Sequence, residues 1–144
     1  MKRSEMVNTV LLDTNIVNYI LLNDSHNLKV FEDVLHNKEF GLSFVTVAEL
    51  ILWALSESNE KLRIIINDFI SECRIFQSNI AIAHRAAEIA LKYNMRSNNS
   101  SRFSKRWHDI WIAATAIEQK VMLITNNIKD FKGIDGLNLF YPVE

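Results

Sequence analysis

The chain has little cysteine, proline or glycine: one, one and three residues among 144. Cys73 has no second cysteine to pair with, so an internal disulfide is excluded, and with no signal peptide before Val7 we expect a reducing, cytoplasmic location. No apolar run approaches the roughly 20 residues that a membrane span needs, so no membrane partner is expected. The formal net charge of −1 gives no global positive field for binding nucleic acid.

What the chain does have is the size and composition of one globular domain, predicted to span residues 1–144. Apolar runs of strand length alternate with amphipathic runs of helix length, which predicts an α/β fold with a largely parallel sheet covered on both faces. The expected strands lie at 10–12, 40–45, 74–77, 121–124 and 139–141. The expected helices lie at 16–22, 28–35, 50–55, 59–73, 79–93 and 107–119, with a polar surface loop at 96–102.

Three acidic residues interrupt apolar sequence at or near predicted helix starts: Asp13, Glu49 and Asp109. Because the carboxyl ends of parallel strands share one edge, Asp13 and the polar group at 125–127 should lie on the same rim of the sheet. Each acid also has a purely structural interpretation. Asp13 can act as a local cap, and Glu49 can complete a capping box that begins at Thr46. Asp109 can be a first-turn acid that the helix dipole stabilises.

The apolar surroundings of these acids favour chemistry over capping. Two carboxylates about 4 Å apart repel by roughly 4 kcal/mol at an effective dielectric near 20, so a cluster of three requires a cation. Carboxylate oxygens suit Mg²⁺ or Mn²⁺, and such ions commonly act on phosphate groups. The matching reaction is attack of metal-activated water on a phosphodiester.

Four segments resemble, in order and spacing, the signature blocks of the PIN (PilT N-terminus) domain: LLDTNIV, TVAEL, HDIWIAATA and LITNNIKDF. Within that family the chain is most similar to the virulence-associated protein C type toxin ribonucleases of type II toxin–antitoxin systems. The resemblance implies a three-layer domain with a mainly parallel sheet of four or five strands between helices. It also implies a metal-dependent endoribonuclease that acts on RNA, an antitoxin protein as partner, and a homodimer.

Carried over residue by residue, the resemblance makes Asp13, Glu49 and Asp109 the catalytic, metal-binding acids. The further positions it implies are Asn127 and Asp130 as additional metal ligands and Thr14, Asn15 and Thr125 as supporting residues. Many relatives carry aspartate where this chain has Asn127, which leaves open whether one metal ion or two are bound. His108, beside Asp109, is expected to point away from it and to have a supporting role or none.

A basic run before Asp109 interleaves cationic with aromatic side chains, as single-stranded RNA binders do. Its cations are Arg96, Arg102, Lys105 and Arg106. The run could equally be a solvated surface. Two alternatives to a nuclease stay open: a PIN-fold module that binds RNA or protein with weakened catalysis, and a phosphatase with Asp13 as nucleophile. Aspartyl-phosphate phosphatases usually carry a second acid two residues later, where this chain has Asn15.

Overall fold

The computed structural model describes residues 8–97 and 107–142. Its strands are β1 Thr9–Leu12, β2 Glu39–Ser43, β3 Arg74–Phe76, β4 Met122–Ile124 and β5 Leu139–Phe140. Its helices are α2 Thr14–Leu21, α3 Ser25–Leu28, the 3-10 helix η1 Lys29–Phe31, α4 Glu32–Leu35, α5 Phe44–Ser56, α6 Glu60–Glu72, α7 Ile80–Ser97, α9 Trp107–Gln119 and α10 Ile128–Phe131. Arg102, Lys105 and Arg106 of the basic run lie outside the described residues.

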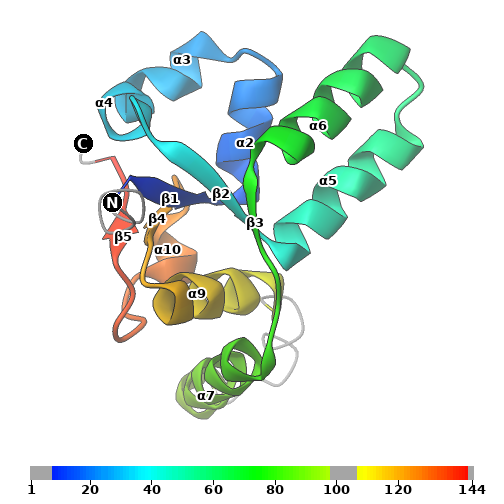
Figure 1. Cartoon of the computed structure of the whole chain (residues 1–144). Helices are drawn as coiled ribbons and strands as arrows, with labels where there is room; N and C mark the ends of the chain where they lie inside the picture. Colours follow the sequence, from blue (N-terminus) through cyan, green and yellow to red (C-terminus); the bar gives the residue numbers. More distant parts are fainter. Residues whose placement is uncertain (1–7, 98–106, 143–144) are drawn as a thin grey trace.

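The five strands form one parallel sheet in the order β3-β2-β1-β4-β5 (Figure 1). β1 lies at the centre, with Val10 paired to Phe40 of β2 on one side and to Met122 of β4 on the other. All strands therefore end at the same edge. The predicted α/β class, with a mainly parallel sheet of four or five strands between helices, is confirmed.

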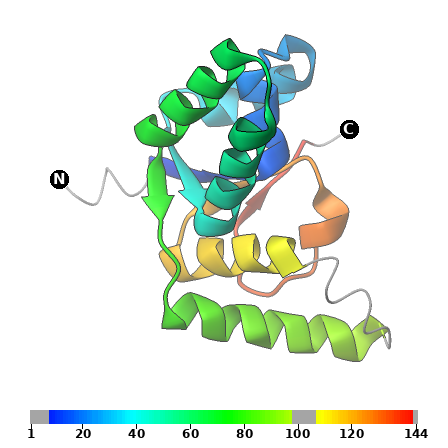
Figure 2. The same ribbon diagram turned by 90° about the vertical axis from the view of Figure 1, so that its right-hand side faces the viewer.

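Helices cover both faces of the sheet, which gives three layers (Figures 1 and 2). Helices α2, α5 and α6 pack on one face around Val10 and Leu12, while α7 and α9 pack on the other around Leu11. Neighbouring residues of β1 alternate between the two cores because successive side chains of a strand point to opposite faces. Burial on both faces explains why Val10, Leu11 and Leu12 of β1 are all apolar.

Several predicted element boundaries were wrong, and the helix expected at 50–55 is α5, which spans Phe44–Ser56. The strand expected at 40–45 ends at Ser43, because Ser43 caps α5 and draws Phe44 and Val45 into the helix. The helix expected at 28–35 is three short segments, α3, η1 and α4. Residues 96 and 97, expected in a polar loop, belong to α7, which extends to Ser97.

In the part of the chain that the structure describes, no helix combines the length and apolarity required to cross a membrane.

Candidate active site at the carboxyl edge of the sheet

The three central strands each end in a buried polar residue. Asp13 follows β1, Ser43 ends β2 and Thr125 follows β4, and all three side chains are buried. The backbone N–H of Asp13 donates to the carbonyl of Ile124 at 3.0 Å, which fixes the ends of β1 and β4 side by side. The predicted polar rim therefore exists, and we call Asp13, Glu49 and Asp109 with their hydroxyl partners the acid rim.

Asp13 is the most enclosed of the three acids, with 5% of its surface exposed. It is the N-cap of α2, because its Oδ1 accepts from the Thr14 N–H at 2.8 Å. Its Oδ2 accepts from the Thr125 hydroxyl at 2.7 Å. Burial raises the pKa of Asp13, these two hydrogen bonds oppose the rise, and the nearby Glu49 carboxylate adds to it.

Glu49 does not complete a capping box. The N-cap of α5 is Ser43, whose Oγ accepts from the Thr46 N–H at 3.2 Å, so Thr46 lies inside the first turn and not at its start. The Glu49 carboxylate instead faces Thr14, whose hydroxyl donates to Oε1 at 2.9 Å. Thr14 thus contacts both acids, Asp13 through its N–H and Glu49 through its O–H. The structural interpretation of Glu49 as a cap is wrong.

Asp109 lies in the first turn of α9, with 8% of its surface exposed. Contrary to expectation, His108 does not point away: its Nε2 is 3.1 Å from Asp109 Oδ1. The charge of His108 also lowers the pKa of Asp13, although less than burial raises it. The His108 side chain at the start of α9 is thus coupled electrostatically to Asp13.

The end of β4 contributes a second polar corner. The Thr125 hydroxyl donates to Asp13 and accepts from the N–H of Asn127 at 2.9 Å, so it joins Asp13 to the start of α10. The Asn127 amide donates to Asp130 in that helix, which brings these two predicted oxygen donors together. Asn126 donates to the Tyr19 hydroxyl of α2 at 2.6 Å and closes the corner from the other side.

The remaining predicted positions are less involved. Asn15 is exposed on the first turn of α2. Arg96 lies in α7, and the other cations of the basic run lie outside the described residues. Ser43 was not predicted as a site residue, Thr46 was predicted only as the start of a capping box, and Tyr19 was not predicted to contact the site. The S-x-x-T spacing before an apolar helix was the available signal for the first two.

The donor chemistry at the acid rim fits a hard divalent cation. Carboxylate and hydroxyl oxygens are the donors around Asp13, and a buried carboxylate next to a second one is relieved by a positive charge. Among the described residues, no group of three or more His, Cys, Asp or Glu side chains stands ready to hold a metal ion. The metal-ligand roles of the three acids therefore stay a proposal.

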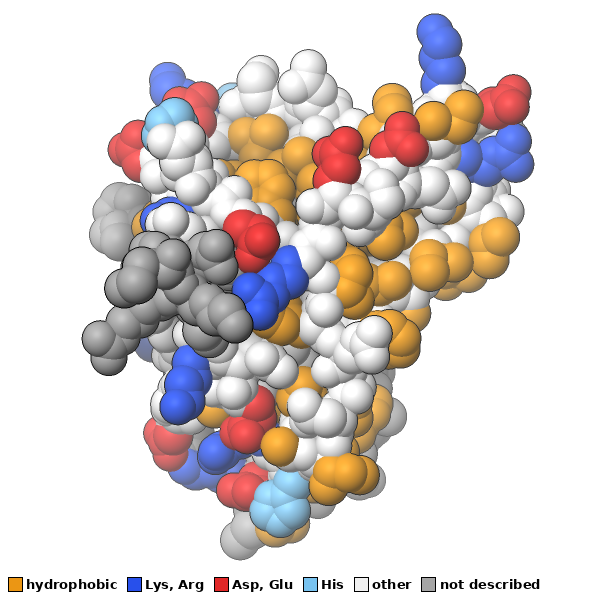
Figure 3. Space-filling view, viewed as in Figure 1, with side chains coloured by type: hydrophobic (Ala, Val, Ile, Leu, Met, Phe, Trp, Pro, Cys, Tyr) orange, Lys and Arg blue, Asp and Glu red, His pale blue; other side chains and the backbone are white. Residues whose placement is uncertain are grey.

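A second unusual region is apolar and exposed. Along α5 and α6, large apolar side chains project into solvent on one side of the molecule (Figure 3). They are Ile51, Leu52, Leu55, Ile64 and Ile65, which we call the apolar arm. A cavity of about 340 Å³ between the two helices is lined by several of them. Exposed apolar patches of this kind mark sites of contact with other molecules.

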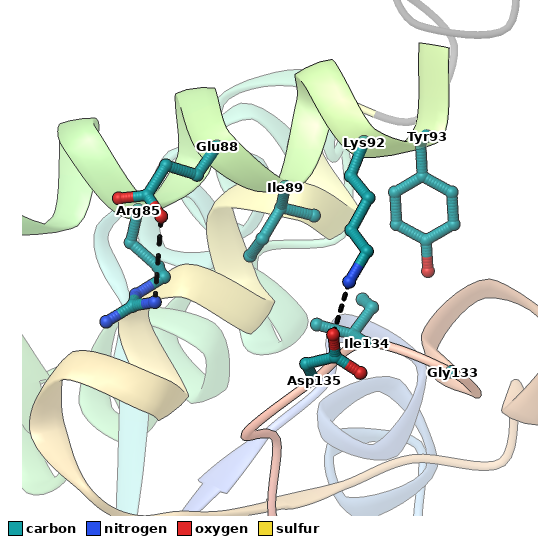
Figure 4. Close-up of a pocket in the computed structure, with 8 residues that line it drawn as sticks. All are labelled: Arg85, Glu88, Ile89, Lys92, Tyr93, Gly133, Ile134 and Asp135. Atoms are coloured by element: carbon teal, nitrogen blue, oxygen red, sulfur yellow. Dashed lines mark hydrogen bonds and ion pairs between the residues drawn. The ribbon is translucent and has the colours of Figure 1, made fainter. Parts of the chain in front are cut away.

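A smaller cavity of about 190 Å³ lies between α7 and the loop that contains Gly133 (Figure 4). Its charged groups pair with one another or with neighbours: Lys92 with Asp135, and Arg85 with Glu118 at 2.8 Å. Ile89 and Ile134 form its apolar wall. The Lys92–Asp135 pair connects the loop to α7 and the Arg85–Glu118 pair connects α7 to α9, so we assign the cavity a structural role.

Comparison with known protein families identifies this arrangement. The model of the PIN domain matches residues 10–137, which contain all three acids and Asp130. The chain belongs to the PIN domain family. The resemblance seen in the four sequence blocks is thereby confirmed, and it extends over most of the chain.

Among curated proteins, the chain is similar to "Ribonuclease VapC1" of Haemophilus influenzae strain R2866. The two are 28% identical over 130 residues, which cover 88% of this chain and 92% of the relative. Ribonuclease VapC1 of Haemophilus influenzae strain 86-028NP matches with the same identity and coverage.

Among solved structures, this PIN domain is similar to VapBC-1 from nontypeable Haemophilus influenzae. The TM-score is 0.71 at 26% identity, covering 92% of this chain and 97% of that chain. DNA-bound VapBC from Salmonella typhimurium matches with a TM-score of 0.74 and the same coverage, and at 20% identity it supports the fold alone.

Proposed function

We propose that this PIN domain is an endoribonuclease that depends on Mg²⁺ or Mn²⁺, and that it is the toxin of a type II toxin–antitoxin pair. The observation that carries the proposal is the pair of acids at the carboxyl edge of the sheet, Asp13 and Glu49, which both accept hydrogen bonds from Thr14. Thr14 contacts Asp13 and Glu49 at once, and Asp13 is buried. The similarity to proteins named ribonuclease VapC1 supports the reaction class.

In this proposal Asp13, Glu49 and Asp109 bind the metal ion. A divalent ion bound there activates water and offsets the negative charge of the phosphate. Thr14 and Thr125 hold the Asp13 carboxylate in one orientation through its two oxygens. His108, with its Nε2 near Asp109, holds that carboxylate at the start of α9.

The polar corner at the end of β4 has an accessory role in this proposal. Asn127 and Asp130 can add oxygen donors at the edge of the rim. Asn127 brings no charge, and its amide is bonded to Asp130, so we assign the main ion to the three acids. Asn15, exposed beside Asp13, is available for contact with substrate.

An antitoxin partner is supported by the apolar arm. Leu55 is 79% exposed and Leu52 67%, which is unusual for large apolar side chains that have no contact to another molecule. An amphipathic segment of an antitoxin can bury these side chains in the way that helices bind apolar grooves. The similar solved structures include VapBC-1 from nontypeable Haemophilus influenzae.

A homodimer and a cytoplasmic location are further parts of the proposal. An apolar surface formed by Phe44, Ala48, Trp107 and Trp111, beside the acid rim, supports contact with a second copy of the chain. Sedimentation analysis of the purified protein tests this directly.

The two alternatives receive less support. A phosphatase with Asp13 as nucleophile matches neither the PIN family model nor the similar proteins. A binding module without catalysis would keep the fold and the apolar arm but would not need the paired acids.

One experiment separates these functions. Purified protein is incubated with single-stranded RNA in Mn²⁺, in EDTA, and in EDTA followed by excess Mn²⁺, with p-nitrophenyl phosphate as a parallel substrate. The proposed nuclease cuts RNA only where free Mn²⁺ is present and leaves the phosphate ester intact. RNA binding without cleavage identifies a binding module, and release of nitrophenol identifies a phosphatase.

A further inference from the structure

Three buried or half-buried hydroxyls form a continuous chain that ends at Glu49. The Ser43 hydroxyl donates to Thr46 Oγ1 at 3.1 Å, Thr46 Oγ1 lies 3.2 Å from Thr14 Oγ1, and the Thr14 hydroxyl donates to Glu49 Oε1 at 2.9 Å. Ser43 and Thr46 have no exposed surface. The chain crosses from the end of β2 to the start of α2, so three separate elements contribute to it.

The direction of this chain follows from the number of protons. Each hydroxyl has one proton to donate. Ser43 donates to Thr46, so the proton of Thr46 is available for Thr14, and the proton of Thr14 is then available for Glu49. This is the arrangement in which all three contacts are hydrogen bonds at the same time. It directs the Thr14 hydroxyl toward the carboxylate.

We propose that Thr46 and Ser43 are positioning residues for Glu49, acting through the Thr14 hydroxyl. The inference rests on the proposed function, since Glu49 matters as a metal ligand there. Thr46 holds Thr14 from one side while Glu49 takes its proton on the other. Without Thr46, the Thr14 side chain loses the contact that fixes its rotamer, and the Glu49 carboxylate loses its fixed place beside Asp13.

Ser43 also has an ordinary structural role, because its Oγ caps the Thr46 N–H at the start of α5. The two roles can be separated at Thr46. A Thr46→Val variant keeps the backbone N–H, and with it the cap, and keeps the shape of the side chain while removing the hydroxyl. Thr46→Ser restores the hydroxyl.

The test measures Mn²⁺ affinity by electron paramagnetic resonance in the absence of RNA. Partners of metal ligands typically change metal affinity by 10- to 100-fold when removed. We expect Thr46→Val to weaken Mn²⁺ binding about tenfold, and Thr46→Ser to stay within about twofold of wild type. Thr115→Val is the matched control: Thr115 is equally buried, but its hydroxyl donates to the Trp111 carbonyl within α9.

A double-variant cycle distinguishes positioning from general damage to the fold. In a Glu49→Ala background the hydroxyl chain has no carboxylate to hold, so adding Thr46→Val should change Mn²⁺ affinity by less than about twofold. Should Thr46→Val weaken binding equally in both backgrounds, or not weaken it at all in the wild type, the positioning role is wrong.

A second variant and a crystal structure complete the test. Ser43→Gly removes the first hydroxyl with a residue that is tolerated at helix N-caps, and it replaces Thr46→Val if that variant does not fold. A crystal structure of the metal-free Thr46→Val protein should show Glu49 displaced or in several rotamers, and a Glu49 in its wild-type place overturns the inference. A wild-type protein that neither binds Mn²⁺ nor cuts RNA contradicts the proposed function instead, and the crystal structure alone then decides the positioning role.

Discussion

The acid rim and the apolar arm depart from ordinary burial in opposite directions. At the rim, Asp13, Asp109 and Thr125 are buried, and Asp13 is 5% exposed. On the arm, leucines and isoleucines project into solvent, and Leu55 is 79% exposed. The cost of burying the Asp13 carboxylate is reduced because both of its oxygens accept hydrogen bonds.

The arm has no such compensation within the described part of the chain. Covering this apolar surface with another molecule removes it from water, which is favourable in free energy. The two departures from the usual burial of side chains therefore indicate two different roles. The buried polar groups of the rim indicate chemistry, and the exposed apolar groups of the arm indicate binding to a partner. Helix α5 links the two regions, because it carries Glu49 in its second turn and Ile51, Leu52 and Leu55 of the arm in its later turns.

The variant with the largest expected effect is Asp13→Asn, which tests the role of the acid rim. We expect RNA cleavage to fall by at least about 100-fold, above the range seen for partners of metal ligands, because the variant removes a charge proposed to bind the metal. The helix cap should survive, since Asn and Asp are equivalent N-caps. Cleavage of a fluorescent RNA in Mn²⁺ is the measurement.

Asp24→Asn serves as the control for that variant. Asp24 is also a helix N-cap, of α3, and accepts from the Asn27 N–H. It should cleave RNA at the wild-type rate. Equal losses in the two variants would mean that Asp13 matters only as a cap.

A charge introduced on the apolar arm should affect partner binding and leave RNA cleavage unchanged. Leu55→Glu should leave RNA cleavage unchanged and alter the free energy of unfolding by no more than about 0.5 kcal/mol, because the side chain is exposed. It should weaken the complex with the proposed antitoxin by about 2 kcal/mol, or roughly 30-fold. Isothermal titration measures the affinity.

Leu91→Glu on α7 is the matched exposed control for the arm, since Leu91 is 61% exposed on a different helix. Affinity that falls equally in both variants would show that the arm is no special surface. Cleavage that falls with Leu55→Glu would connect the arm to the rim.

The basic run is predicted to attract RNA independently of both the acid rim and the apolar arm. Replacing Arg102, Lys105 and Arg106 by Ala should reduce the slope of log affinity against log salt by up to about 2, since each phosphate contact on a single strand contributes about 0.7. Fluorescence anisotropy with RNA at several salt concentrations measures the slope. Mn²⁺ affinity should stay the same, and a slope equal to that of wild type would make the run a solvated surface.

The smallest effect concerns stability and pH at the rim. Burial raises the pKa of Asp13, so its ionised form is less favourable in the folded state than in the unfolded chain. The stabilising contribution of the protonated form is complete below about pH 4 and disappears as pH rises through the raised pKa.

Metal-free Asp13→Asn should therefore gain stability relative to wild type between about pH 4 and pH 7. Thermal unfolding of both proteins across this range, without metal, tests the sign. Parallel stability curves would show that hydrogen bonds from Thr14 and Thr125 fully offset the burial of the charge.

The sequence predicted the larger elements well for identifiable reasons. The apolar run at β1 and the strongly apolar helix α9, expected and found at 107–119, are specified by hydrophobic pattern alone. Phe44 and Val45 were misassigned to a strand because aromatic and β-branched residues favour strands, whereas the Ser43 cap decided the local structure. The region 28–35 broke into short helices although its spacing resembled one helix.

The site followed the same division. That Asp13 and Thr125 would meet follows from parallel strands ending together, and the two contact each other across 112 residues of sequence. The role of Glu49 was ambiguous, because a capping box and a facing carboxylate have the same local pattern.

By itself, the sequence determined the α/β class, the order of strands and helices along the chain, and the placing of acids at strand ends and helix starts. Only the tertiary structure decided which hydroxyl meets which carboxylate, and that Leu52 and Leu55 stay exposed. The physical reason is that hydrophobic periodicity is a local property. Contacts such as Thr14 with Glu49, 35 residues apart, depend on the register of the strands and on how α2 and α5 leave the sheet.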